Sequence, residues 1–393
     1  MSQASTLASH PTRDPHSYPR FSEQEMAARH AAVYGMIEEA GVAGLLVYSS
    51  GLMSAELYWL TDHPGTRESY VLVQPGAEPV VLIQLYNHVP LARSLSVVPD
   101  VRWAGARTGR TVAELLEERG LTAGRVGLAG GAPFSQYVAI RQQLPDLELV
   151  DLSGKLRTLR TIKSDAEIER LRIASKLTDD SMQALASELR PGLREDELAA
   201  IIEPVYLKQG GYAGIHFMTS MPMHEPNFPV PAQHQSNRVL QVGDCLITEI
   251  SGYYWGYGGQ IHRTYSLGEG PTPKWQRLHD VAVEAFEVIF DTIKEGVSSR
   301  EIEEAAEVIH ARGLTIYDDL LHGNAQLPPI IQTRSTRRHE DAEVILRENM
   351  VLVIQPNVMT PDEKMGLQFG ETVVVRKNGC ETLDHFPREW IVC

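Results

Sequence analysis

The chain has 393 residues, of which 43% are hydrophobic and 22% are charged, and its net charge is −15. That length suits two domains that each bury a core of their own. The negative charge argues against a nucleic-acid partner, and no apolar run reaches the roughly 18 residues that would span a membrane.

The three cysteines, Cys245, Cys380 and Cys393, form no CxxC pair. This usage suits a reducing compartment and not a disulfide framework. Residues 1–20 are polar, contain three prolines and lack the apolar segment of a signal peptide. We therefore expect a cytoplasmic protein whose first 20 residues are loose or held by a partner.

Residues 1–157 are expected to form an α/β domain with a mixed sheet. A capping box at 22–25 begins a helix that continues to about residue 39. An amphipathic helix at 111–120 ends at a glycine. Apolar, β-branched runs of strand length occupy residues 44–49, 70–75, 80–85, 125–130 and 148–153.

Residues 158–393 are expected to form an α+β domain with helices on one face of a sheet. Another capping box, at 164–167, begins a helix that continues to about residue 189. The Asn378-Gly379 pair favours a hairpin turn. Further helices are predicted at 194–209, 274–295 and 299–312, and strands at 245–251, 260–268, 350–357 and 371–383.

Four sequence blocks of the second domain resemble the catalytic domain of the creatinase / aminopeptidase P / prolidase superfamily. They are LRTIKSDAEIERLRIAS (159–175), Gly243-Asp244 with EISGYYWGYGGQIHRT (249–264), MVLVIQPN (350–357) and GETVVVRKNGCETL (370–383). The first half also resembles the superfamily's N-terminal domain. The resemblance implies a creatinase-type N-terminal domain and a C-terminal pita-bread domain. It also implies a homodimer, because active sites of this fold form near a dimer interface.

Metallopeptidases of this superfamily hold two divalent ions with two aspartates, one histidine and two glutamates. The matching positions here are Glu249, Gln260, His322, Gln355 and Gly370, with Glu371 beside the last. Neutral amides are weak ligands for such ions, and one matched carboxylate remains, or two if Glu371 turns inward. We therefore expect no two-metal centre and no cofactor, and no proline-peptide hydrolysis by the family mechanism.

Creatinase, which this chain resembles, keeps the fold without metals and hydrolyses a C–N bond in a small zwitterion. The sequence therefore favours a metal-independent hydrolase of a C–N bond in a small polar nitrogenous metabolite. That substrate would carry an amidine, amide or urea-like group and a carboxylate. The chain differs from creatinase at His262, where creatinase has an active-site glutamate before Arg-Thr.

Two histidines are rival candidates for a proton shuttle, a role that suits a side chain titrating near neutrality. His234 precedes SNRVLQVGD, where the superfamily places a catalytic histidine, although the spacing is about two residues short. His224 lies in MPMHEPNF. A solvated loop histidine is the alternative interpretation of each.

Three candidate site residues lie on the strands around 245–268. Glu249 is surrounded by apolar residues, where a carboxylate is costly unless it is paired. We expect it to orient a histidine or to bind a cationic group, with a structural ion pair as the alternative. Gln260 and His262 alternate along one strand and so point to the same face. Gln260 is expected to hold an amide or water, and His262 to assist proton transfer.

Three further residues complete the expected pocket. His322, which follows two leucines, is expected to help move protons, although such a histidine is often only structural. The amide of Gln355 needs hydrogen-bond partners if it is buried, and a substrate could supply one. Glu371 lies one place out of register with the family position and is equally a structural residue.

Arginines are expected to grip the substrate carboxylate through bidentate hydrogen bonds. Arg67 resembles a creatinase arginine that reaches the partner subunit's site, and a surface arginine is the alternative. Arg334 resembles a second creatinase arginine, while Arg337 and Arg338 are equally placed by spacing. The expected partners are thus a small-molecule substrate and a second copy of the chain, with no nucleic acid and no membrane.

Two other functions stay open. One is a single-metal hydrolase or lyase, including Xaa-Pro peptidase-like activity, that uses Glu249, His262, His322 and Glu371. The other is a non-catalytic pita-bread binding protein.

Overall fold

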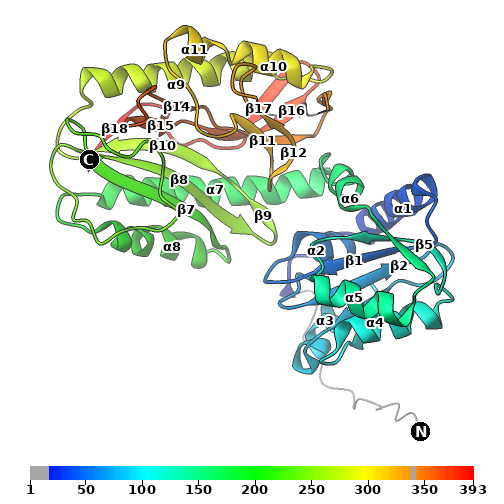
Figure 1. Cartoon of the computed structure of the whole chain (residues 1–393). Coiled ribbons are helices and arrows are strands. Elements are labelled where there is room, and N and C mark those ends of the chain that lie inside the picture. Colours follow the sequence, from blue (N-terminus) through cyan, green and yellow to red (C-terminus); the bar gives the residue numbers. More distant parts are fainter. Residues whose placement is uncertain (1–16, 338–341) are drawn as a thin grey trace. The chain divides into compact units, whose positions relative to one another are not determined.

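The computed structural model describes residues 17–337 and 342–393. Its residue contacts divide the chain into two compact units, Met1–Leu159 and Arg160–Cys393 (Figure 1). This division lies two residues from the boundary that the sequence predicts. Arg338 and most of the predicted loose N-terminal segment lie outside the described residues.

The first unit is built on a six-stranded mixed sheet with the order β4-β3-β2-β1-β5-β6. The β1–β2 and β2–β3 pairs are antiparallel, and the remaining pairs are parallel. The strands are β1 (Leu45–Ser49), β2 (Ser69–Val73), β3 (Val80–Ile83), β4 (Asp100–Trp103), β5 (Gly124–Ala129) and β6 (Leu147–Asp151). The helices are α1 (Glu23–Ala40), α2 (Ala55–Thr61), α3 (Val89–Leu95), α4 (Thr108–Glu118), α5 (Phe134–Gln143) and α6 (Ser153–Leu159).

Helices cover both faces of this sheet, because every second side chain of a strand points to the same face. Leu45 and Val47 of β1 pack in a core with α1, α2, α3 and α6. Leu46 and Tyr48 pack in a second core with α4 and α5. The α/β domain with a mixed sheet that the sequence predicts is therefore confirmed.

The second unit contains two five-stranded sheets and a short two-stranded ribbon, β14-β15. The first sheet has the order β18-β10-β8-β7, with β9 paired to β8, and the second has the order β12-β11-β13-β16-β17. The strands are β7 (Tyr212–Pro222), β8 (Asp244–Tyr254), β9 (Tyr257–Gly258), β10 (Ile261–Ser266), β11 (Leu321–Gly323), β12 (Leu327–Ile331), β13 (Val351–Ile354), β14 (Asn357–Met359), β15 (Gly366–Gln368), β16 (Glu371–Arg376), β17 (Gly379–Thr382) and β18 (Ile391–Val392).

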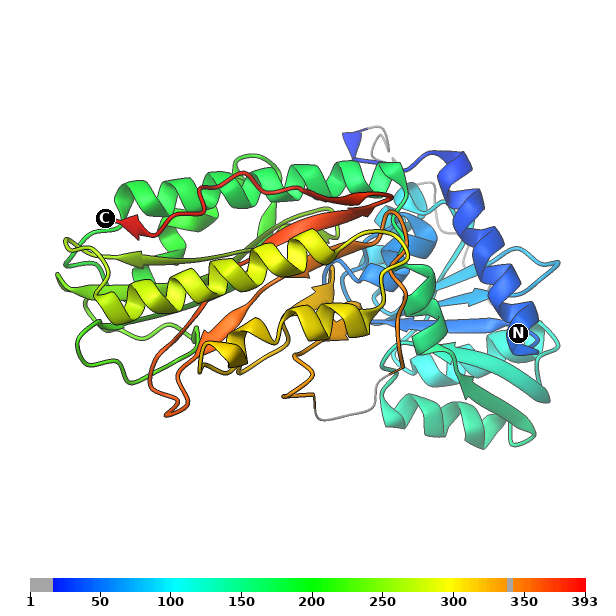
Figure 2. The same ribbon diagram turned by 90° about the horizontal axis from the view of Figure 1, so that it is seen from above.

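Helices line the outer sides of these sheets, as Figures 1 and 2 show. A capping box of Ser164 and Glu167 begins the longest of them. Leu246 and Ile250 of β8 and Ile261 of β10 form one core with α7 and α8. A second core joins α9 and α10 to β13 and β16. The helices are α7 (Asp165–Glu188), α8 (Ala199–Leu207), α9 (Pro273–Thr292), α10 (Ser299–Ala305) and α11 (Val308–Ala311).

The two sheets meet where His262 of β10 bridges Gly370, the residue before β16. The backbone N–H of each residue donates to the carbonyl of the other, at 3.1 and 3.2 Å. This junction brings strand residues from both sheets to one place, and the predicted pita-bread domain is confirmed. Within residues 17–337 and 342–393, no helix has the length and apolar character needed to cross a membrane.

Candidate functional site

A cluster of polar side chains fills the junction of the two sheets. Gln260, just before β10, donates through Nε2 to Glu249 Oε1 at 3.0 Å and to Gln355 Oε1 at 3.3 Å. The same Nε2 lies 3.2 Å from His262 Nε2, and His262 Nε2 lies 3.7 Å from Glu249 Oε2. Four of the predicted site residues are therefore in direct contact.

Strand periodicity explains why these side chains converge. On β8, Leu246 and Ile250 face α7 and α8, so Glu249 points to the opposite face. On β10, Ile261 likewise packs against those helices, and its neighbours Gln260 and His262 point inward. The apolar residues on the helix-facing sides of the strands thus determine which polar residues reach the junction.

His322 of β11 adds a second buried imidazole ring beside the cluster. Its Nδ1 lies 2.9 Å from the carbonyl oxygen of Gly323, which can only accept, so Nδ1 carries the proton. The side chain of Gln355 lies beside the ring, and its hydrogen bond favours the protonated form of His322. Burial lowers the pKa of His322 and holds that of His262 well below its usual value. Both histidines are neutral at physiological pH.

Glu249 has an acid strength suited to proton transfer. Burial, reinforced by the negative charge of Asp318, raises its pKa to about 7. A carboxyl group with this pKa is present in both protonation states near neutrality, as a general acid or base requires.

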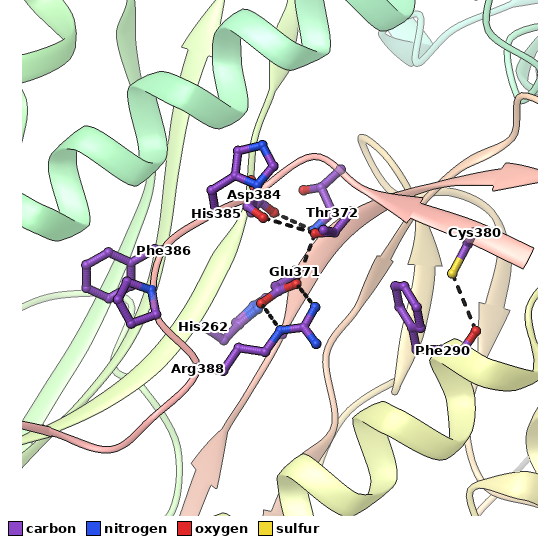
Figure 3. A network of polar contacts seen from close by, with 12 residues as sticks. His262, Phe290, Glu371, Thr372, Cys380, Asp384, His385, Phe386 and Arg388 are labelled. Carbon is purple, nitrogen blue, oxygen red and sulfur yellow. Dashed lines mark hydrogen bonds and ion pairs between the residues drawn. The ribbon is translucent and has the colours of Figure 1, made fainter.

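Glu371 does not point into the cluster. It accepts from Arg263 at 2.7 Å and from Arg388 at 2.9 and 2.7 Å, and its side chain is 1% exposed. Figure 3 shows Arg388 against Glu371, with the Thr372 N–H bonded to Asp384 beside them. Burial alone would raise the pKa of Glu371, but the two guanidinium groups hold it below its usual value. The neighbouring residue that faces the cluster is Gly370, which has no side chain that could contact it.

The other predicted site residues make no hydrogen bond or ion pair with the cluster within the described residues. His224 and His234 are exposed. Ala232, two residues before His234, contacts β7 by accepting from the Met218 N–H at 3.0 Å. Arg67 is exposed on the first unit, and nothing tests its predicted reach into a partner's site. Arg334 lies 3.2 Å from Glu304.

Sequence reasoning missed an acidic pair beside the cluster. Asp319 Oδ2 accepts from Gln355 Nε2 at 3.2 Å, and its pKa is raised to about 8 by burial and by Asp318. These residues lie between α11 and β11, outside any regular strand. The one available signal was their position three and four residues before His322.

The residues present do not fit the two divalent ions of the superfamily. Gln260 and Gln355 turn N–H groups toward carboxylates, so these amide nitrogens act as donors and not as ligands. Gly370 has no side chain, and the carboxylate of Glu371 is held by two arginines. No group of three or more His, Cys, Asp or Glu side chains in residues 17–337 and 342–393 is arranged to hold a metal ion.

Comparison with known proteins establishes the family. Residues 169–377, more than half of the chain, match metallopeptidase family M24, and residues 29–162 match the creatinase/prolidase N-terminal domain. The chain belongs to this family of pita-bread proteins.

Its relatives carry the names of peptidases. The "Uncharacterized peptidase YqhT" of Bacillus subtilis is 25% identical over 90% of this chain and 97% of its own length. The Xaa-Pro dipeptidase of Pyrococcus horikoshii is 24% identical over 68% of this chain and 74% of its own length. Among solved structures, the Xaa-Pro dipeptidase from Bacillus anthracis has a TM-score of 0.80 at 22% identity and covers 94% of this chain and 100% of its own. At 22% identity, this structural similarity shows that the two chains share a fold.

These names contradict the function that the sequence favours. A metal-independent, creatinase-like hydrolase of a small nitrogenous metabolite is wrong as the main interpretation, because the relatives that match most of the chain are named dipeptidases and peptidases. The error came from taking the exchanged ligand positions as evidence of a different substrate class. The peptidase alternative agrees better with the comparisons.

The buried ion pairs of Glu371 predict a large stability difference between two similar substitutions. Glu371→Gln leaves the guanidinium of Arg263, which is 1% exposed, without a counter-charge, and should lower the free energy of unfolding by about 3–5 kcal/mol. Glu381 also pairs with two arginines, but its side chain is 38% exposed. Glu381→Gln should cost less than about 1 kcal/mol. Urea titrations of both variants measure this, and equal losses would contradict it.

The raised pKa of Glu249 predicts a pH-dependent stability. The folded state holds this proton more tightly than the unfolded state, so Glu249 should lower the free energy of unfolding as pH rises from about 4.5 to about 7. Glu249→Gln should remove this contribution and gain up to about 3 kcal/mol relative to the unsubstituted protein between pH 4.5 and pH 8. Urea titrations across this range test it, and parallel pH curves for the two proteins would refute it.

Proposed function

We propose that this chain hydrolyses an amide bond in a short peptide and that the cluster around Glu249 is its active site. The observation that carries the proposal is a buried carboxyl group with a pKa of about 7 at the sheet junction of a metallopeptidase-family fold. The relatives named as dipeptidases and Xaa-Pro dipeptidases support the substrate class.

Amide hydrolysis places specific demands on such a carboxyl group. The oxygen of a water molecule attacks the carbonyl carbon, and ionised Glu249 accepts the proton that the water loses. When the C–N bond breaks, protonated Glu249 returns that proton to the leaving nitrogen. A group with a pKa near the working pH performs both transfers well.

The surrounding side chains hold Glu249 in place for this chemistry. Gln260 donates to one of its oxygens, at 3.0 Å, and is itself held by Gln355. His262 is neutral and fully buried, so it adds no charge that would keep Glu249 permanently ionised. Gln260 therefore acts as a positioning residue in this scheme.

The purified chain should release free amino acids from short peptides such as alanylalanine and alanylproline at neutral pH. Glu249→Gln keeps the shape of the side chain but cannot accept a proton, and it should lower kcat/KM at least about 100-fold. Asp362→Asn changes an exposed residue in the loop between β14 and β15 and should leave kcat/KM unaltered. Amino-acid release followed by mass spectrometry measures all three proteins.

The same experiment decides between catalysis and mere binding. If no peptide is cleaved, with or without added zinc or manganese, the proposed function fails. Equal peptide affinity for the unsubstituted protein and Glu249→Gln would then favour the non-catalytic binding protein.

We propose in addition a homodimer in which Arg67 of one copy reaches the pocket of the other, a role supported by its exposure and by the creatinase resemblance. If so, Arg67→Ala and Glu249→Gln should each be weakly active alone. Mixed and re-associated, they should regain about a quarter of the full activity, because half of the dimers carry one intact site. Sedimentation velocity checks the dimer, and absence of any recovery from mixed dimers would contradict the shared site.

A cytoplasmic location also belongs to this proposal. It is supported by three cysteines that are all free thiols, as expected of a reducing compartment.

A further inference from the structure

Tyr253 lies on the same strand and on the same face as Glu249. Side chains along a strand alternate between its two faces, so residues 249, 251 and 253 of β8 point to one side. Gly252 lies on the other side, since a Cβ added there would lie 3.5 Å from Leu177 Cβ of α7. Tyr253 therefore belongs to the strand surface that faces the cluster.

Two glycines leave room for the ring of Tyr253 and show the direction in which it leans. A Cβ added to Gly214 of β7 would lie 2.3 Å from Cδ2 and Cε2 of the ring and 2.8 Å from the carbonyl oxygen of Ser251. A Cβ added to Gly258, the partner of Tyr253 on β9, would lie 2.7 Å from its Cζ. The ring thus reaches the level of Ser251, which means that it leans along β8 toward Glu249.

The hydroxyl of Tyr253 is a donor without an acceptor. It makes no hydrogen bond within residues 17–337 and 342–393. Burial, reinforced by the negative charge of Glu249, raises the pKa of Tyr253, so the phenol keeps its proton at neutral pH. The side chain is half-buried, which leaves it within reach of a bound ligand.

Peptide hydrolysis requires a donor of this kind, because the carbonyl oxygen becomes negatively charged when water attacks the carbonyl carbon. The two glutamine amides of the cluster already have acceptors. Gln260 Nε2 donates to Glu249 and to Gln355. Gln355 Nε2 donates to both the backbone carbonyl and Oδ2 of Asp319. The phenol of Tyr253 is free to serve the substrate.

We propose that the Tyr253 hydroxyl donates a hydrogen bond to the carbonyl oxygen of the scissile amide and stabilises the negative charge that forms there. This inference rests on the proposed peptide hydrolysis and adds a catalytic residue to its site. Water attacks the carbonyl carbon and Glu249 accepts the proton that the water loses. The phenol keeps its own proton throughout, and its hydrogen bond strengthens as the charge on the oxygen grows.

Removal of the hydroxyl alone tests this role. Tyr253→Phe keeps the ring between the two glycines and should lower kcat for alanylalanine at least about 100-fold, with KM changed less than about threefold. Tyr254→Phe is the matched control, because Tyr254 is the next residue of β8 but packs against the core with α7 and α8. It should leave both constants unchanged. An unaltered kcat in Tyr253→Phe would overturn the proposal.

Tyr317 is the other tyrosine whose pKa is raised by burial and by the charge of Glu249. Its hydroxyl is buried, whereas the side chain of Tyr253 is within reach of a ligand. Tyr317→Phe should therefore lower kcat less than Tyr253→Phe does. A loss of kcat in Tyr317→Phe without a loss in Tyr253→Phe would assign the role to Tyr317 and overturn the proposal.

A ligand that carries a permanent oxyanion gives a measurement that needs no turnover. The phosphinic analogue of alanylalanine replaces the amide by a tetrahedral, negatively charged P–O group. Isothermal titration calorimetry compares Glu249→Gln, which does not cleave the peptide, with the same chain carrying Tyr253→Phe as well. The second substitution should weaken the analogue at least about tenfold and alanylalanine less than about twofold. Equal losses for the two ligands would show a structural role and overturn the proposal.

The outcomes separate this inference from the proposed function. A selective loss of analogue affinity, without cleavage of any peptide by the unsubstituted chain, would keep Tyr253 as the oxyanion donor of the site and remove the hydrolase. Cleavage of alanylalanine with the same kcat by the unsubstituted chain and Tyr253→Phe would support the hydrolase and remove the role of Tyr253. Analogue binding that a chelator abolishes would assign the oxyanion to a bound ion, which would also overturn the proposal.

Discussion

The buried ion pair of Arg263 and Glu371 stabilises the second unit at the junction of its two sheets, next to the candidate site. Both side chains are 1% exposed, and Arg263 also donates to the carbonyls of His262, Gly370, Phe386 and Pro387. One guanidinium group thus joins β10, the start of β16 and the C-terminal segment. Buried charged side chains are stable only when all their partners are present, because a buried charge without a counter-charge lowers the free energy of unfolding by several kcal/mol.

That ion pair fixes the site although it takes no part in the proposed chemistry. Arg263 directly follows His262, and Glu371 directly follows Gly370. Since neighbouring residues of a strand point to opposite faces, locking the outer pair fixes the direction of the inner pair. Added to Gly370, a Cβ would lie 2.6 Å from His262 Nδ1, so the imidazole ring occupies the space that a side chain there would need. The glycine and the histidine are therefore compatible with each other.

Strand periodicity accounts for most of what the sequence predicts correctly. Apolar runs and capping boxes predict the two-domain architecture, and alternation brings Glu249, Gln260 and His262 to one face, as the structure shows. The same rule could have placed Glu371 on the side of α9, because it alternates with Val373 and Val375, which pack against that helix.

Features without periodicity could not be predicted in this way. The strand β4 has four residues with a single buried one, Val101, so it forms no apolar run. Asp318 and Asp319 lie outside regular structure, and their direction depends on Asn357, about 40 residues away along the chain. His234 belongs to a loop whose length differs from the superfamily spacing, so counting residues from Gly243 could not locate it.

The two exchanged residues, Gln260 and Gln355, change the charge balance of the cluster. Gln260 and Gln355 replace carboxylates and donate to those that remain, Glu249 and Asp319. Their amide groups relieve part of the repulsion but supply no net positive charge. The cluster therefore limits its negative charge by protonation, because burial raises the pKa of Glu249 to about 7 and that of Asp319 to about 8. The exchange of carboxylates for amides thus leaves Glu249 with the intermediate acidity that the proposed hydrolysis requires.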